Sequence, residues 1–181
     1  MTEFAHDKVV PLQNSTLSKK EQVADMFDNI AFKYDFMNRF LSAGIDITWR
    51  KKALKELLKL NPKTILDVAT GTADVAIMAA EILKPDKITG IDISDGMLDF
   101  GRTKIEKLGL SNMIELLNGD SETINFPDNS FDAVTVAFGV RNFEHLEKGL
   151  SDIKRVLKPG GKLVVLECCQ PKTFGVKQFY N

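Results

Sequence analysis

From Ser18 to about residue 60, apolar residues recur at helical spacing among polar ones. Residues 1–17 are polar and aperiodic, and we predict a flexible arm there. Ser18-Lys-Lys-Glu21 is typical of a capping box and precedes apolar residues at helical spacing. We predict one helix from Ser18, a second over 34–41 that ends at Ser42-Ala-Gly44, and a third over 48–60 that Asn61-Pro62 ends.

The third predicted helix is amphipathic. One face carries Trp49, Ala53, Leu57 and Leu60. The other carries Arg50, Lys51, Lys55 and Lys59, which we interpret as a solvated surface. Such a basic face also offers a contact for anionic lipid, so peripheral association with the inner face of a membrane is a second interpretation.

Beyond residue 62 the pattern changes to short apolar runs that alternate with amphipathic stretches. The repeated strand–helix–strand order predicts an α/β fold, a Rossmann-like doubly wound and mostly parallel sheet, behind the helical cap. We therefore divide the chain into the arm (1–17), a helical N-terminal cap (18–61) and an α/β domain (62–181). The expected strands are 64–69, 87–92, 113–117, 133–138 and 162–167; the expected helices are 74–83, 94–108 and 144–157, with a turn at Lys158-Pro-Gly-Gly161.

Composition narrows the possible classes of protein. The chain has 181 residues, of which 44% are hydrophobic and 27% charged, as in one globular domain. A net charge of -1 argues against a nucleic-acid partner. No apolar run approaches the roughly 18 residues of a membrane span, and the N-terminal residues lack a signal-peptide pattern, so we expect a cytoplasmic protein. The neighbours Cys168 and Cys169, expected as free thiols, and the isolated His6 and His145 predict no metal site.

Polar residues follow the first three predicted strands, where a doubly wound sheet binds ligands. Gly71 lies in a loop of small residues after Asp67; alone, this loop fits a cofactor site and an ordinary tight turn equally well. Asp92 suits the two hydroxyls of a ribose, or a helix N-cap. Asp120 suits the amine of adenine, with the Ser121 N–H donating to a ring nitrogen, although a solvated loop acid is the simpler interpretation.

Together the three strand ends predict a pocket for an adenosine-containing ligand. A nicotinamide dinucleotide would need more glycine at its pyrophosphate than Ala73 and Asp74 provide. Asp74 would also repel a bound anion, whereas a cationic sulfonium tolerates it. S-adenosyl-L-methionine is therefore the expected cofactor.

Four motifs resemble those of class I S-adenosylmethionine-dependent methyltransferases: Leu66–Ala73, Gly90–Ser94, Phe126–Asp132 and Arg155–Gly161. Three further stretches are more specific and resemble the C-methyltransferases of menaquinone and ubiquinone biosynthesis. These are Tyr34-Asp-Phe-Met-Asn38 with Ser42–Arg50, Thr135–Asn142, and Val165–Glu167 with Pro171. Two positions depart from the family pattern: Ala73 replaces a glycine, and Ile124-Asn125-Phe126 replaces Leu-Pro-Phe.

The resemblance implies cofactor contacts at Thr72, Asp92, Asp120 and Ser121, with Asp67 and Gly71 shaping the loop around the methionine end. It also implies a polyprenyl hydroquinone substrate, methylated on a ring carbon, as in the conversion of demethylmenaquinol to menaquinol. The ubiquinone-pathway benzoquinol is a second possible acceptor, and a small O- or N-nucleophile is a third. A nucleotide-binding module without catalysis and a dehydrogenase are the two interpretations that involve no methyl transfer.

Three residues are candidates for catalysis on such a substrate. Arg141 would stabilise the developing phenolate, Asn142 would orient the ring hydroxyl, and Tyr34 would close over the ring or relay a proton. The same residues could instead serve the fold, as a surface ion pair, a helix N-cap and a core aromatic, respectively.

The length of the chain adds two expectations. The resemblance to class I methyltransferases implies a sheet of seven strands, whereas the pattern here predicts five. We therefore expect this chain to be a piece of a longer protein, or a longer protein that is partly ordered. The fifth strand would then leave an open edge, which favours pairing with another chain, such as a homodimer partner.

Overall fold

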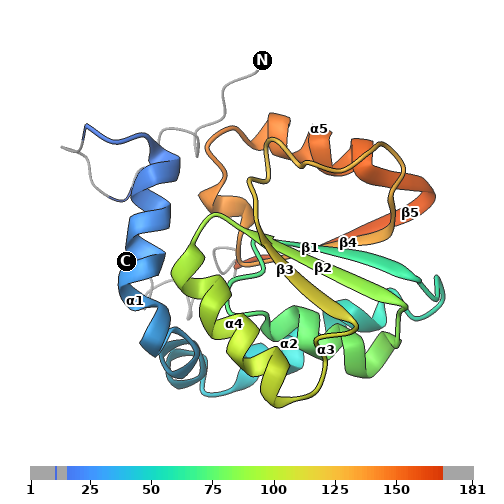
Figure 1. Cartoon of the computed structure of the whole chain (residues 1–181), viewed down its shortest axis with the longest axis horizontal. Helices are drawn as coiled ribbons and strands as arrows, with labels where there is room; N and C mark the ends of the chain where they lie inside the picture. The colour runs from blue at the N-terminus through green and yellow to red at the C-terminus, as the bar shows by residue number, and fades with distance from the viewer. Residues whose placement is uncertain (1–10, 12–15, 169–181) are drawn as a thin grey trace, which may run out of the picture.

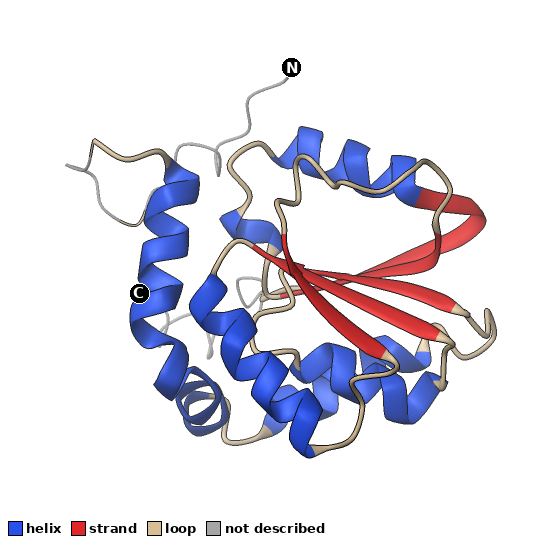
Figure 2. Ribbon diagram, viewed as in Figure 1, coloured by secondary structure: helices blue, strands red, loops and turns tan. Residues whose placement is uncertain are grey.

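The computed structural model describes residue 11 and residues 16–168, which form a five-stranded parallel sheet with helices on both faces (Figures 1 and 2). The strand order is β3-β2-β1-β4-β5, so the chain reverses its winding direction between β1 and β4. Ligands bind at such a reversal, beyond the carboxyl ends of the strands. The strands are β1 (Thr64–Val68), β2 (Lys87–Asp92), β3 (Ile114–Asn118), β4 (Phe131–Ala137) and β5 (Leu157–Leu166).

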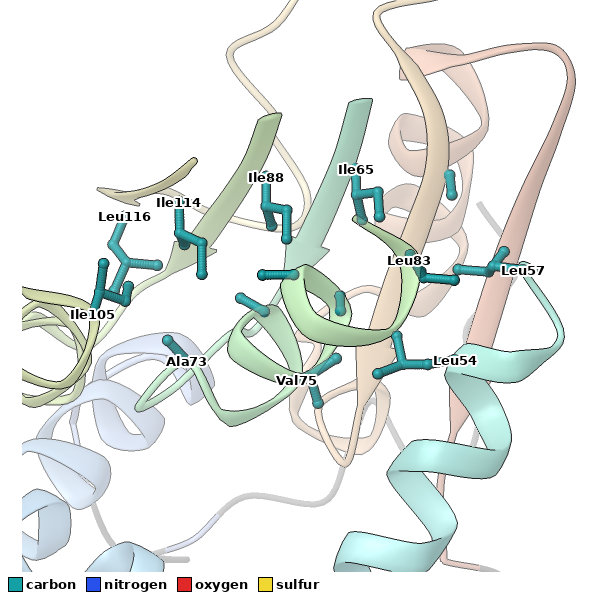
Figure 3. Packing of buried hydrophobic residues seen from close by; sticks show 14 of the residues in the cluster. Leu54, Leu57, Ile65, Ala73, Val75, Leu83, Ile88, Ile105, Ile114 and Leu116 are labelled. Atoms are coloured by element: carbon teal, nitrogen blue, oxygen red, sulfur yellow. The ribbon is translucent and has the colours of Figure 1, made fainter. Parts of the chain in front are cut away.

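Two apolar clusters hold the helices to the sheet. On one face lie α2 (Ile45–Lys55), α3 (Asp74–Leu83) and α4 (Asp95–Lys107), and on the other lies α5 (Leu146–Val156) (Figure 1). Leu54 and Leu83 pack with Ile65 and Ile88 in the first cluster, where the small residues of α3 let the helix approach closely (Figure 3). Leu66, Val134 and Ile153 belong to the second cluster. The predicted fold is confirmed.

The N-terminal helix α1 (Lys19–Leu41) is continuous, which corrects the prediction of two helices. The capping box at Ser18 is confirmed: its side chain accepts from the Glu21 N–H, and the Glu21 carboxylate accepts from the Ser18 N–H. Between Ile30 and Tyr34 there is no glycine, proline or capping residue, so nothing interrupts the helix. The helix ends at Ser42, and Ala43 and Gly44 then take left-handed conformations (φ 49° and 76°).

Helix α2 differs from the prediction in its bounds and in its faces. It begins at Ile45 and ends at Lys55, with hydrogen-bonded turns over the following residues. Arg50, expected on the solvated face, is only 5% exposed, because its guanidinium forms ion pairs with Asp46 and Asp74. Trp49, expected on the buried face, is 42% exposed.

The turn predicted at 158–161 lies inside the fifth strand. Phe131 of β4 pairs with Leu157, but Ala133 pairs with Lys162, so four residues bulge out between two ladder positions. Gly160 has φ 82°, which only glycine adopts without strain. β5 forms an edge of the described sheet, with Leu163 and Val165 partly exposed.

Candidate cofactor and substrate site

An open cavity of about 640 Å³ lies at the carboxyl ends of the strands. Most of the residues predicted for the site line it, namely Tyr34, Gly71, Asp92, Asp120, Ser121 and Asn142. These six candidates for cofactor and substrate binding therefore share one space.

Asp92, at the end of β2, is held by backbone donors. One carboxylate oxygen accepts from the Gly71 N–H (2.8 Å) and the other from the Ser94 N–H (3.0 Å). Burial raises the pKa of Asp92, while these hydrogen bonds and that of Ile93 act against the rise. Each carboxylate oxygen has a second lone pair, so the side chain retains acceptor sites toward the cavity. The arrangement fits a ribose diol.

Asp67, within β1, is buried beside the loop rather than in the main cavity. It accepts from the hydroxyls of Thr70 (2.7 Å) and Thr135 (2.6 Å), tying the loop to β4. Burial raises its pKa to about 6, against the opposing effects of both hydroxyls and of Arg50. These hydrogen bonds hold the loop after β1 against β4.

Asp120 follows β3 and forms an ion pair with Lys20 from the first turn of α1. Lys20 also lies 3.9 Å from the carboxylate of Glu122. Burial alone would lower the pKa of Lys20, but the hydrogen bond and charge of Asp120 raise it above the ordinary value. Asp120 is therefore not a free, solvated loop acid. It lines the cavity, and its carboxylate is already paired with the Lys20 ammonium.

Thr72 lies under α1, outside the main cavity. Its hydroxyl donates to Asp35 of α1 (2.5 Å) and accepts from Lys104 (3.0 Å). It lines a smaller hollow of about 340 Å³ together with Tyr34, Asp67 and Gly71. Tyr34 and Gly71 line both spaces, so the loop separates a larger chamber from a smaller one.

Asp74 is neutralised by three cations, which corrects the expectation that it would repel a bound anion. Its carboxylate lies 2.6 Å from Lys104, 3.3 Å from Arg50 and 3.5 Å from Arg39. A carboxylate so paired does not repel an anion as a free one would, so Asp74 does not discriminate against a dinucleotide. Arg50 Nε, by contrast, is buried without a hydrogen-bond partner in the part of the chain that the structure describes.

Of the three candidate catalytic residues, two line the cavity and one does not. Tyr34 lines the cavity from α1, edge-on to Phe27 at 5.7 Å between ring centroids. Asn142 ends the short 3-10 helix Val140–Asn142 that follows β4, and it lines the same cavity. Arg141 points elsewhere: it is 52% exposed and forms an ion pair with Glu167.

Helix α1 supplies three tethers that the sequence did not reveal. Lys20 binds Asp120, Asp28 accepts from the Ser94 hydroxyl (2.5 Å) and the Gly96 N–H (2.9 Å), and Asp35 binds Thr72 and Lys104. Each tether reaches the loop after a different strand. The sequence signal was present only as charged residues at 20, 28 and 35, two helical turns apart on one face.

The backbone around the cavity is strained at residues other than glycine. Ala69, Ala73 and Phe138 all have left-handed φ angles (54°, 65° and 59°). A Cβ on Gly139 would lie 2.5 Å from the Ala69 Cβ, so a side chain there would displace the loop. Such strain is common at ligand sites and persists only where surrounding contacts fix it.

Known proteins share this sequence pattern along most of the chain. The profile of the ubiE/COQ5 methyltransferase family matches residues 15–181. The chain belongs to this family. The demethylmenaquinone methyltransferase of Bacteroides fragilis is 50% identical over 178 residues, which are 98% of this chain and 72% of that protein. The demethylmenaquinone methyltransferase of Porphyromonas gingivalis is 42% identical over 97% of this chain and 71% of that protein. The ubiquinone/menaquinone biosynthesis C-methyltransferase UbiE of Geobacter sulfurreducens is 44% identical over 90% of this chain and 64% of that protein.

Solved structures agree on the fold. A SAM-dependent methyltransferase from Aquifex aeolicus matches with a TM-score of 0.61 and 31% identity, covering 69% of this chain and 66% of that chain. The [4+2]-cyclase SpnF matches with a TM-score of 0.72 at 23% identity, covering 85% of this chain and 62% of that chain, which shows the fold alone. S-adenosylmethionine is the cofactor of this family member, and the acceptors that Asp92 and Asp120 present to the cavity fit its adenosine part.

The cysteines and histidines can also be placed. Cys168 is an exposed free thiol, whereas Cys169 and His6, like Pro171, lie outside the described residues. His145 is exposed before α5, and its backbone N–H donates to the Glu122 carboxylate. In the described ranges no group of His, Cys, Asp and Glu has the arrangement of a metal site, and no helix is long and apolar enough to cross a membrane.

Proposed function

We propose that this chain methylates a ring carbon of a polyprenyl hydroquinone, with demethylmenaquinol as the acceptor and menaquinol as the product. The observation that carries the proposal is the shared cavity, in which Tyr34 and Asn142 face the same space as Asp92 and Asp120. The names of the relatives at 42–50% identity support menaquinone biosynthesis. The ubiquinone-pathway benzoquinol is the second candidate, because the Geobacter relative is named for both pathways.

In this proposal the cofactor residues are Asp67, Gly71, Thr72, Asp92, Asp120 and Ser121. Asp92 binds the ribose hydroxyls, and Asp120 with the Ser121 N–H binds adenine. Asp67, Gly71 and Thr72 fix the loop, the first and last through the hydrogen bonds described above. Bound S-adenosylmethionine supplies an electrophilic methyl group, so the main task left to the protein is to place the ring carbon in line with it.

Tyr34, Asn142 and Arg141 act on the acceptor. Asn142 holds the ring hydroxyl, and Tyr34 covers the ring and passes the hydroxyl proton to water as negative charge develops. Arg141 stabilises that charge after it exchanges Glu167 for the phenolate oxygen. The Arg141 side chain is exposed, and Arg141 directly precedes Asn142 in the sequence. The exchange therefore needs a movement of this side chain only.

The test is methyl transfer to a short-chain demethylnaphthoquinol, with the product mass measured against a benzoquinol acceptor. Tyr34→Phe, Asn142→Ala and Arg141→Ala should each lower turnover while leaving the affinity for S-adenosylhomocysteine nearly unchanged. A parallel loss of that affinity would assign these residues to the cofactor instead. Mass spectrometry of the quinones in cells that lack the protein names the natural acceptor.

A further inference from the structure

The second half of α1 exposes a row of aromatic side chains. Phe32, Phe36 and Phe40 are spaced four residues apart, and they are 64%, 71% and 74% exposed. The rings of Phe36 and Phe40 stack with 6.0 Å between centroids. Large apolar side chains grouped in this way mark an interaction surface, whereas single ones do not.

Further exposed apolar residues follow in the sequence, at the end of α1 and in the first turns of α2. Leu41, at the end of α1, is 77% exposed, and Ile45 and Trp49 in the first turns of α2 are 49% and 42% exposed. On α2, Ile45, Trp49 and Lys52 share one side of the helix, because they are spaced four and three residues apart. We call Phe32, Phe36, Phe40, Leu41, Ile45 and Trp49 the aromatic face.

The exposed charges of the segment that carries the aromatic face are basic as far as Lys55, and the exposed acid Glu56 follows directly. Every exposed charged side chain between residues 30 and 55 is basic: Lys33, Arg39, Lys51, Lys52 and Lys55. The two acids of this segment turn inward, Asp35 to Lys104 and Asp46 to Arg50. Lys51, Lys52 and Lys55 are exposed and form no salt bridge among the described residues, and the Lys33 ammonium lies over the Phe32 ring, 5.0 Å from its centroid.

We propose that the aromatic face docks on the surface of an anionic lipid bilayer. Aromatic rings enter the boundary between headgroups and acyl chains, and a basic fringe attracts anionic headgroups. A second copy of the chain is a poor occupant, because an isologous contact would set one basic fringe against the other. The sequence predicted a lipid contact through basic residues alone. The proposal keeps Lys51 and Lys55 in that contact, adds the aromatic face, and excludes the buried Arg50.

Docking in this orientation brings the cavity close to the bilayer. Tyr34, which lines the cavity, lies two residues from both Phe32 and Phe36 and so on the opposite side of α1. One helix, about 10 Å across, therefore separates lipid from the site. A polyprenyl tail can stay in the bilayer while its ring enters the cavity; this consequence rests on the proposed function, whereas the docking itself does not.

Trp49 provides a direct readout because it is the only tryptophan of the chain and lies on the aromatic face. The full chain is mixed with vesicles of equal parts phosphatidylglycerol and phosphatidylethanolamine, or of phosphatidylcholine alone. We expect co-sedimentation with the anionic vesicles, a blue shift of Trp49 emission, and weakening of both by salt. No methyl-transfer assay is involved, so a failure here leaves the proposed function standing.

Phe36→Ser with Phe40→Ser should lower vesicle affinity by at least about tenfold, because each buried phenylalanine ring contributes on that scale. Lys51→Glu with Lys52→Glu should lower affinity for anionic vesicles and reduce the salt dependence. The matched control is Leu163→Ser with Val165→Ser, two partly exposed apolar residues of β5 that should leave binding unchanged.

Three results would overturn the proposal. The first is no binding of the folded chain to anionic vesicles. The second is binding that persists unchanged in both the serine and the glutamate variants. The third is a dimer in solution that the serine variant dissolves while vesicles bind neither form, which would assign the aromatic face to a second copy of the chain.

Discussion

Lys20 and Asp120, separated by 100 residues of sequence, form an ion pair at the mouth of the cavity. The pair joins the first turn of α1 to the loop after β3. Asp120 is the residue proposed to accept the amine of adenine, so Lys20 and the cofactor share one carboxylate. We therefore expect the affinity for the cofactor to depend on Lys20, which lies outside the methyltransferase motifs of this sequence.

Lys20→Met should tighten the binding of S-adenosylhomocysteine by about two- to fivefold, the free energy of a partly exposed ion pair. The variant frees Asp120 and also removes a positive charge from the cavity wall. Titration calorimetry measures the change, with Asp120→Asn as the comparison that should weaken binding. Weaker binding in Lys20→Met would mean that Lys20 holds the ligand rather than competes with it.

Asp67→Asn should change the pH dependence of stability. Burial raises the pKa of Asp67 to about 6, above the ordinary value of 3.8, so the native state holds a proton that the unfolded state releases. The Asp67 contribution to the free energy of unfolding therefore falls as pH rises from about 4 to about 6, by up to about 3 kcal/mol. Urea unfolding at a pH of about 4.5 and of about 7.5 measures this. Relative to the original chain, the free energy of unfolding of Asp67→Asn should be higher at the higher pH than at the lower one. An equal effect at both values would place the carboxylate in its charged form throughout.

Asp132→Asn should destabilise the fold, with the opposite pH dependence. Although burial opposes it, the hydrogen bonds from Lys158, Thr64 and Lys63 hold the pKa of Asp132 at about 2. The stability it contributes is complete above the unfolded value of 3.8 and is lost as pH falls toward 2. Because the side chain is partly solvated, we expect a loss of about 1–2 kcal/mol near neutral pH. Thermal unfolding checks this, and the difference should shrink below a pH of about 4.

Lys84→Gly should stabilise the chain by about 1 kcal/mol. Lys84 is the C-cap of α3 with φ 50°, it precedes Pro85, and its side chain is exposed. Glycine adopts this conformation without strain, while Lys84→Ala, which keeps the Cβ, should bring no gain. The two variants differ in one methyl group, so equal melting temperatures would reject left-handed strain as the cause.

Local periodicity was sufficient to predict the sheet and the helices that cover it. The bounds of α3 and β2 match their predicted ranges, because short branched runs and small-residue helices leave distinct patterns. Periodicity failed where a contact spans the chain. Arg50 carries the pattern of a solvated lysine-rich face, yet its partner Asp74 lies 24 residues away and draws it inside.

The residues at the strand ends of the candidate site were predictable from the sequence, whereas their contacts with other elements were not. Asp92, Asp120 and Ser121 follow strands whose positions fix the cavity, so a rule about strand ends places them correctly. That rule does not say which side chains cover a loop. Thr72 belongs to the loop by sequence, but Asp35 and Lys104 enclose it, and Arg141 follows β4 yet turns toward Glu167.

The tethers of α1 restrict the length of this helix more than its composition. Lys20, Asp28 and Asp35 reach three different loops from one face, and an added residue between Asp28 and Asp35 would turn the later tether by about 100° around the helix axis. Substitutions on the outer face leave that alignment intact, whereas a single insertion or deletion separates Asp35 from Lys104. Homologous sequences that keep all three tethers should therefore show no gaps within α1, even where the residue types on its outer side differ.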